Sequence, residues 1–176
     1  MTTFIVKLNH ILTDFTLNNL PENRMDLVAR CVNAALWLDH DIRKNNEILF
    51  HFSNDRLVTI NGAYIKQMRP DERNIASFFK HIQEGKLFPG IKLENKKFEE
   101  LINELKNEHT FVLDADGIDL STYAHGQIIE NSTFILGDDV GLSKDFGFKA
   151  IKIGSKSYLA SHCISFLNIY LDDYYD

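Results

Sequence analysis

The stretch Thr133-Phe134-Ile135-Leu136-Gly137-Asp138-Asp139-Val140-Gly141 joins a short, mostly apolar run to a turn that contains two glycines. The same order recurs at Thr110-Phe111-Val112-Leu113-Asp114-Ala115-Asp116-Gly117 and at Ala150-Ile151-Lys152-Ile153-Gly154-Ser155. Runs this short and apolar are typical of strands that are covered on both faces, as in a parallel sheet. The sequence therefore predicts strands over residues 110–113, 133–136 and 150–153.

The rest of the chain alternates further strands with amphipathic helices. Apolar runs predict strands at Phe4–Leu8, Glu47–Ser53, Leu57–Ile60 and Ile91–Leu93. Apolar residues three and four positions apart predict helices from Asn23 for about four turns, from Pro70 to about Glu84, from Lys97 to Lys106 and from about Leu159 to Asp172. No linker or repeat interrupts residues 1–176, so we expect one α/β domain with a mainly parallel sheet flanked by helices.

The ends of the first helix carry recognisable signals. Asn23 is predicted to be its N-cap, and Asp26 lies in its first turn, where a carboxylate meets free N–H groups and the helix dipole. Arg43 and Lys44 stand where the end of a helix favours cations.

Composition limits the possible partners. The chain has 176 residues, 44% of them apolar and 25% charged, with a net charge of −6. A protein that covers phosphates over a broad face is usually basic, so a general nucleic-acid coat protein is not expected, whereas the net charge is compatible with a small basic patch at one site. No run approaches the roughly 18 apolar residues that cross a membrane, and two cysteines are too few for a disulfide framework, so a cytoplasmic protein is expected.

The three glycine turns suggest where a ligand binds. In open parallel sheets, ligands bind beyond the carboxyl ends of the strands. Converging turns would offer backbone N–H and C=O groups between apolar walls, which suits a neutral or zwitterionic nucleoside; ordinary turns are the alternative. The chain has no Walker motif, no G-x-G-x-x-G and no paired histidine spacing, so neither a phosphate cradle nor a metal site is expected.

Four ordered blocks resemble the tRNA pseudouridine N1-methyltransferase family of the SPOUT superfamily. They are Arg24–Leu36 (RMDLVARCVNAAL), Arg69–Arg73 (RPDER), Phe134–Leu142 (FILGDDVGL) and Leu159–Ile164 (LASHCI). The blocks extend from the first helix to the last, so the resemblance covers most of the chain.

The resemblance implies a C-terminal trefoil knot, S-adenosyl-L-methionine (SAM) as cofactor, and a homodimer. It also implies that the cofactor lies among the three late loops and contacts Leu113, Leu136, Gly137, Ile153, Gly154, Leu159 and Cys163. Cys163 is expected to pack its sulfur against the cofactor and not to act as a nucleophile.

The reaction implied is methylation of N1 of a pseudouridine in tRNA. Asp26 is the candidate base for the N1 proton, with helix capping or a structural salt bridge as its alternative role. Arg24 would hold a phosphate or the base carbonyl, or else pair with Asp26. Further phosphate or substrate contacts are candidates at Arg30, Asn33, Arg43, Arg69 and Arg73.

One departure from the family pattern concerns the substrate. The family usually has Gly-Asp-His where this chain has Gly137-Asp138-Asp139. An acid replaces a side chain that can carry positive charge, so two alternatives stay open. One is a SPOUT methyltransferase acting on another RNA nucleotide, and the other is a catalytically inactive dimer that binds SAM or RNA.

Overall fold

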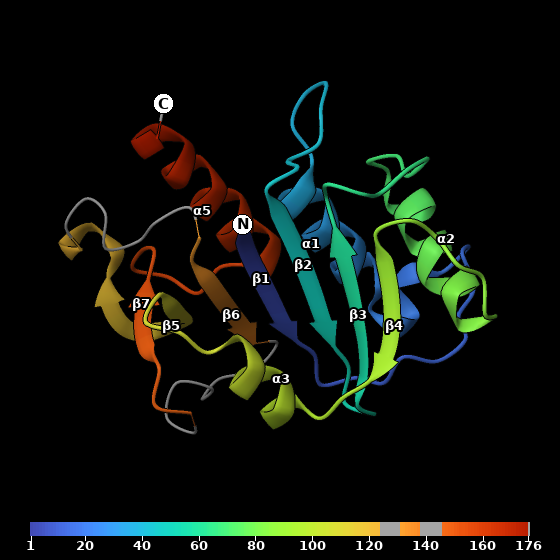
Figure 1. The fold of residues 1–176 in the computed structure, drawn as a ribbon, viewed down its shortest axis with the longest axis horizontal. Helices are drawn as coiled ribbons and strands as arrows, with labels where there is room; N and C mark the ends of the chain where they lie inside the picture. The colour runs from blue at the N-terminus through green and yellow to red at the C-terminus, as the bar shows by residue number, and fades with distance from the viewer. Residues whose placement is uncertain (124–130, 138–145, 176) are drawn as a thin grey trace.

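The computed structural model describes residues 1–123, 131–137 and 146–175. Seven strands form one sheet in the order β4-β3-β2-β1-β6-β5-β7 (Figure 1). The strands are β1 (Thr2–Lys7), β2 (Asn46–His51), β3 (Arg56–Asn61), β4 (Ile91–Asn95), β5 (Thr110–Asp119), β6 (Thr133–Gly137) and β7 (Lys149–Lys152). The helices are α1 (Met25–Leu36), α2 (Glu72–Gln83), α3 (Phe98–Leu105) and α5 (Ala160–Tyr175), with 3-10 turns η1 (Leu20–Asn23) and η2 (Leu120–Thr122).

Five neighbouring strands are parallel. β1 pairs in parallel with β2 and β6, and β5 pairs in parallel with β6 and β7. Only the β2–β3 and β3–β4 pairs are antiparallel among the described strands. The predicted α/β class with a mainly parallel sheet is confirmed.

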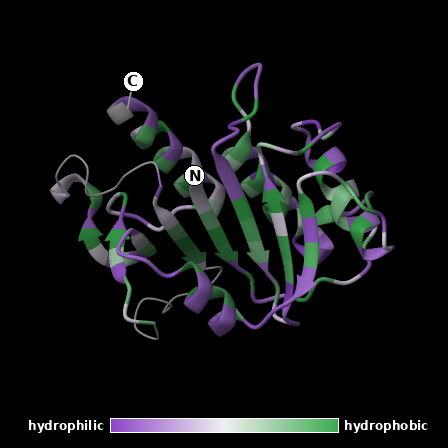
Figure 2. Cartoon of the chain, in the orientation of Figure 1, coloured by the Kyte–Doolittle hydropathy of each residue, from purple (hydrophilic) through white to green (hydrophobic). Residues whose placement is uncertain are grey.

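Both faces of the sheet are buried, which explains the apolar runs in its strands. On one face, Phe4, Phe134 and Phe111 stack across β1, β6 and β5 with ring centroids 5.7 and 6.0 Å apart. On the other face, Ile5 and Ile135 pack in a cluster with residues of α3. Successive residues of a strand point to opposite faces, so a strand covered twice needs apolar residues throughout. Figure 2 shows the resulting hydrophobic colouring of the central strands and the hydrophilic colouring of α3.

Buried polar groups fix α5 against α1. The Asn46 amide donates to the Ala35 carbonyl at 2.8 Å and to Asn168 Oδ1 at 2.9 Å. The Asn168 amide donates in turn to the Ala34 carbonyl at 2.9 Å. These bonds join the first residue of β2, the last turn of α1 and the middle of α5, and so hold the C-terminal helix in one register over the first helix.

The ends of α1 differ from those predicted. Asn23 ends η1, and Arg24, with φ +56°, caps α1 with no side-chain hydrogen bond, so Asn23 is not the N-cap. The helix stops at Leu36 because Trp37 is extended and forms a β-bridge with Ile42. Arg43 therefore lies beyond the helix, where it pairs with Asp172 of α5.

The turn predicted at residues 114–117 lies inside β5 instead of ending it. Ile151 of β7 pairs with both Leu113 and Ile118, so the four residues between them leave the ladder as a bulge. At Gly117 a side chain could not be accommodated, since a Cβ would lie 2.7 Å from the Ile151 backbone. The strand thus continues to Asp119 after the bulge.

Candidate cofactor site

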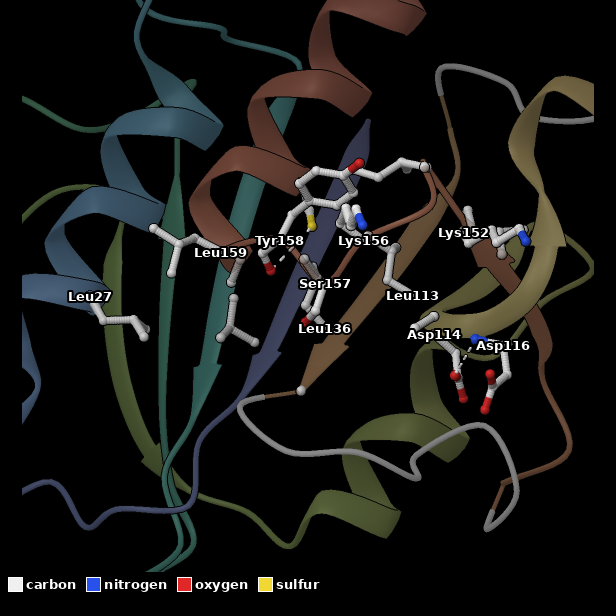
Figure 3. A pocket seen from close by; sticks show the side chains of 18 of the residues that line it. Leu27, Leu113, Asp114, Asp116, Leu136, Lys152, Lys156, Ser157, Tyr158 and Leu159 are labelled. Carbon is white, nitrogen blue, oxygen red and sulfur yellow. Dashed lines mark hydrogen bonds between the residues drawn. The ribbon is translucent and has the colours of Figure 1, made fainter.

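A cavity of about 320 Å³ opens at the carboxyl ends of β1, β6 and β7 and beside the bulge of β5. Its apolar residues include Val6 and Leu8 from the end of β1 and Leu27 from α1. Figure 3 shows Leu27 and Leu159 toward one end of the group and Asp114, Asp116 and Lys152 toward the other. Small-molecule sites usually measure about 300–1,000 Å³, so the cavity can hold much of a nucleoside-sized ligand.

The bulge of β5 forms one wall of the cavity. Asp114, Ala115 and Asp116 line it, and the Asp114 carboxylate accepts a hydrogen bond from the Asp116 N–H at 2.9 Å. This Asx-type turn fixes the bulge locally and leaves the exposed Asp116 side chain at the charged end of the cavity.

The segment after β7 forms a second wall. The Tyr158 ring packs directly over Gly154: a Cβ on Gly154 would lie 2.5 Å from Tyr158 Oη and 3.0 Å from Cε2. Any larger residue at position 154 would push the Tyr158 ring away, so glycine permits this close approach. The Tyr158 carbonyl accepts a hydrogen bond from the Cys163 thiol at 3.9 Å. The first turn of α5 is thereby tied to the loop that precedes it.

All seven residues predicted to contact the cofactor line this one cavity. They are Leu113, Leu136, Gly137, Ile153, Gly154, Leu159 and Cys163. Their convergence follows from the strand order, because β6, β5 and β7 are neighbours and parallel. Residues 138–145, which continue the loop after Gly137, lie outside the described residues. They include Asp139, the position at which the chain departs from the family pattern.

The two predicted catalytic residues occupy different positions. Arg24 lines the cavity, whereas Asp26 is not among its lining residues. Asp26 Oδ2 accepts from Arg30 Nη2 at 3.2 Å, and the Asp26 side chain is 18% exposed. Asp26 Oδ1 is buried with no hydrogen-bond partner among the described residues. Both the predicted salt-bridge role and an unsatisfied carboxylate oxygen are therefore present in the same side chain.

The other candidate substrate residues are not brought together at the cavity. Arg43 forms a two-pronged pair with Asp172 at 2.7 and 2.6 Å. The Asn33 amide donates to the Pro70 carbonyl at 2.7 Å and so holds the loop that precedes α2. Arg69 lies 3.8 Å from Asp71 on the surface, and Arg73 lines a separate shallow groove beside Lys80.

Burial determines the state of Cys163. Desolvation raises the pKa of its thiol to about 11, so the thiol stays protonated at neutral pH. A protonated thiol is a poor nucleophile, which agrees with a packing role. Within the described residues no group of three or more His, Cys, Asp or Glu side chains could hold a metal ion.

Sequence reasoning missed several residues of the cavity wall. Val6 and Leu8 could have been found, because the rule for parallel sheets applies to β1 as much as to the late strands. Tyr158 and Lys156 follow the third glycine turn directly, but no motif distinguishes them from ordinary loop residues.

Comparisons with known proteins agree with this geometry. A family model described as "putative SAM-dependent RNA methyltransferase" matches residues 1–174. The chain is 34% identical to a tRNA (pseudouridine(54)-N(1))-methyltransferase of Thermococcus kodakarensis, over 98% of this chain and 99% of the relative. It is 33% identical to the protein of the same name from Pyrococcus abyssi, over 98% of each.

A solved structure shares the fold. Archaeoglobus fulgidus Nep1, crystallised with S-adenosylhomocysteine, superposes with a TM-score of 0.68 at 13% sequence identity, over 98% of each chain. The family model matches almost the whole length, and the relative from Thermococcus kodakarensis is 34% identical over 98% of the chain. The chain therefore belongs to the SAM-dependent RNA methyltransferase family.

Proposed function

We propose that this protein is a SAM-dependent tRNA methyltransferase that methylates N1 of pseudouridine 54. The observation that carries the proposal is the convergence of three separated glycine-containing segments on one cavity at the carboxyl ends of parallel strands. The identity with relatives of that name over 98% of the chain supports the choice of substrate.

The residues that line the cavity suit SAM chemically. Leu113, Leu136 and Ile153 supply apolar surface, and Gly137 and Gly154 allow a ligand to approach the backbone. The charged groups at its edge include both carboxylates and ammonium groups, as a ligand with a zwitterionic tail requires. Cys163, buried and protonated, would pack against the cofactor through its sulfur.

The chemistry required of the protein is proton removal and alignment. When bound, SAM supplies an electrophilic methyl group, so the acceptor nitrogen needs only to be aligned and deprotonated. Asp26 would take the proton from N1 as the N1–methyl bond forms and the methyl–sulfur bond breaks. Arg24, which lines the cavity, would stabilise the negative charge that develops on the base.

The position of Asp26 suits contact with the nucleobase better than with the cofactor. It lies in the first turn of α1, two residues from Arg24 and outside the cavity wall. One carboxylate oxygen is bound to Arg30, and the other is buried without a hydrogen-bond partner in the part of the chain that the structure describes. The carboxylate must therefore turn, or exchange Arg30 for the substrate, before it accepts the proton.

We also propose that the protein acts as a knotted homodimer in the cytoplasm. Phe166 and Ile169 expose apolar side chains on α5, and Phe166 stacks on Tyr170, which gives a second copy an apolar surface to bury. The two free cysteines and a tRNA substrate suit a reducing compartment. In the described residues no helix is long and apolar enough to cross a membrane. Light scattering tests the dimer, and an experimental structure that traces residues 124–145 tests the knot.

The activity test uses two matched transcripts. Purified protein, SAM and a tRNA transcript carrying pseudouridine at position 54 are incubated beside the same transcript carrying uridine there. Nucleoside mass spectrometry should detect N1-methylpseudouridine in the first only. Methylation of both transcripts would redirect the proposal to another nucleotide, and methylation of neither, with SAM bound, would indicate an inactive binder.

A further inference from the structure

Tyr158 has surroundings that the proposed reaction does not explain. It is the one aromatic residue among the described residues that line the cavity, and it is 44% exposed. Its ring packs over Gly154, which also lines the cavity, so one part of the ring lies against the backbone of that loop. The rest of the ring is available to a ligand that enters the cavity.

The direction of the bound cofactor follows from the position of Arg24. If Arg24 acts on the substrate base, the transferred methyl group and its sulfur lie toward α1, the end marked by Leu27 in Figure 3. The amino-acid tail, which carries both charges, then suits the charged end formed by Asp116 and Lys152. Figure 3 shows Tyr158 between Leu27 and that charged end, so the uncharged nucleoside half suits the part of the wall that holds Tyr158.

We propose that Tyr158 stacks on the purine ring of the cofactor and is a binding determinant of this site. The inference rests on the proposed function and adds the residue that recognises the planar base. A flat aromatic surface beside the apolar residues Leu113 and Ile153 suits a purine, because stacking covers one face of the planar ring without requiring a particular hydrogen-bond pattern. Tyr158 is placed by the first turn of α5, since its carbonyl accepts the Cys163 thiol.

The test measures binding of three ligands to three proteins by calorimetry. The ligands are S-adenosylhomocysteine, 5′-methylthioadenosine, which keeps the nucleoside but lacks the amino-acid tail, and SAM. The proteins are wild type, Tyr158→Phe, which keeps the aromatic ring, and Tyr158→Leu, which keeps apolar volume only. Tyr64→Leu is the matched control, because Tyr64 is 64% exposed and does not line the cavity.

If Tyr158 stacks on the purine, its replacement should reduce the affinity of all ligands that share the nucleoside by the same factor. Base–aromatic stacking contributes about 1–3 kcal/mol, so Tyr158→Leu should raise the Kd of all three ligands by a common factor of about 5 to 150. Tyr158→Phe and Tyr64→Leu should stay within about twofold of wild type, and thermal unfolding should show that each variant is folded.

Three results would overturn the inference. If Tyr158→Leu binds the ligands as tightly as wild type, the Tyr158 ring does not contribute to binding. A loss confined to SAM would assign the ring to the charged sulfur, and equal losses in Tyr158→Phe and Tyr158→Leu would assign the effect to the hydroxyl. If wild type binds none of the three ligands, the proposed function itself fails, which is a separate outcome.

Discussion

The reactivity of Cys163 gives a quantitative test of its environment. Its thiol pKa is raised from 9.0 to about 11 by burial. At pH 8 the thiolate fraction then falls from about one in ten to about one in a thousand, so alkylation should be roughly 100-fold slower than for an exposed thiol. Iodoacetamide labelling, followed by mass spectrometry of the Cys163 peptide, measures the rate, with denatured protein as the unperturbed reference.

Steric protection alone would also slow the labelling, and the pH dependence separates the two causes. A raised pKa predicts that the rate keeps rising tenfold per pH unit through pH 9 and 10, whereas a shielded thiol of ordinary pKa would level off near pH 9. A plateau at that pH would refute the assignment.

The same reasoning predicts the effect of replacing Cys163. A thiol that packs against the cofactor, and attacks nothing, can lose its sulfur without stopping methyl transfer. Cys163→Ala should therefore weaken binding of S-adenosylhomocysteine modestly and keep kcat within about tenfold of wild type. Complete loss of turnover in a folded, ligand-binding variant would reopen the nucleophile role.

Three further predictions concern stability and binding. Asn168→Ala leaves the buried Asn46 amide with one partner fewer and should lower the free energy of unfolding by about 1–3 kcal/mol in urea titration, so an unchanged midpoint would contradict the role of the buried pair. Burial lowers the pKa of His51 below 6.5, so the unfolded chain takes up the proton first. The free energy of unfolding should then be level above about pH 6.5 and fall as the pH drops, and His51→Gln should flatten that slope; an equally steep slope in the variant would exclude His51 as its source. Gly154→Ala places a Cβ 2.5 Å from Tyr158 Oη and should therefore raise the Kd of S-adenosylhomocysteine. The factor should be smaller in a Tyr158→Leu background, where the clashing ring is gone, than in wild type; equal factors would show that the two residues act independently.

The sequence predicted the architecture because the fold depends on hydrophobic period, which is a local property. Apolar runs such as Phe134–Leu136 lie in strands with two covered faces, and the structure places them centrally in the sheet. The sequence offered convergence of the three glycine turns as one of two alternatives, because ligands bind beyond the carboxyl ends of parallel strands. The individual residues Leu113, Gly137 and Gly154 came from the family resemblance, and the structure places all three at one cavity. The hydrophobic pattern of single segments does not predict the order of the strands, in which β6 lies between β1 and β5.

Other features depend on contacts between distant residues. The bulge at residues 114–117 looks like a simple turn in sequence, and only pairing of Ile118 with Ile151 shows that the strand resumes. Likewise, Arg43 resembles a residue at a helix end until Asp172, 129 positions away, is seen to bind it. Such pairings between distant residues do not alter the hydrophobic periodicity of either segment, so the sequence does not reveal them.

The start of α1 shows why capping rules failed where the site begins. Asn23 has the side chain favoured at an N-cap, but it closes η1, and the next residue must reverse the backbone into the left-handed region to begin α1. Glycine or asparagine adopts that conformation at little cost, whereas other residues pay about 1–2 kcal/mol. The chain places an arginine there, and Arg24 is one of the residues that line the cavity. A non-glycine residue held in a costly backbone conformation beside a cavity is a candidate for a functional role. We therefore propose that Arg24, and not the predicted cap Asn23, is the functionally important residue at the start of α1, and that it is held there for the substrate.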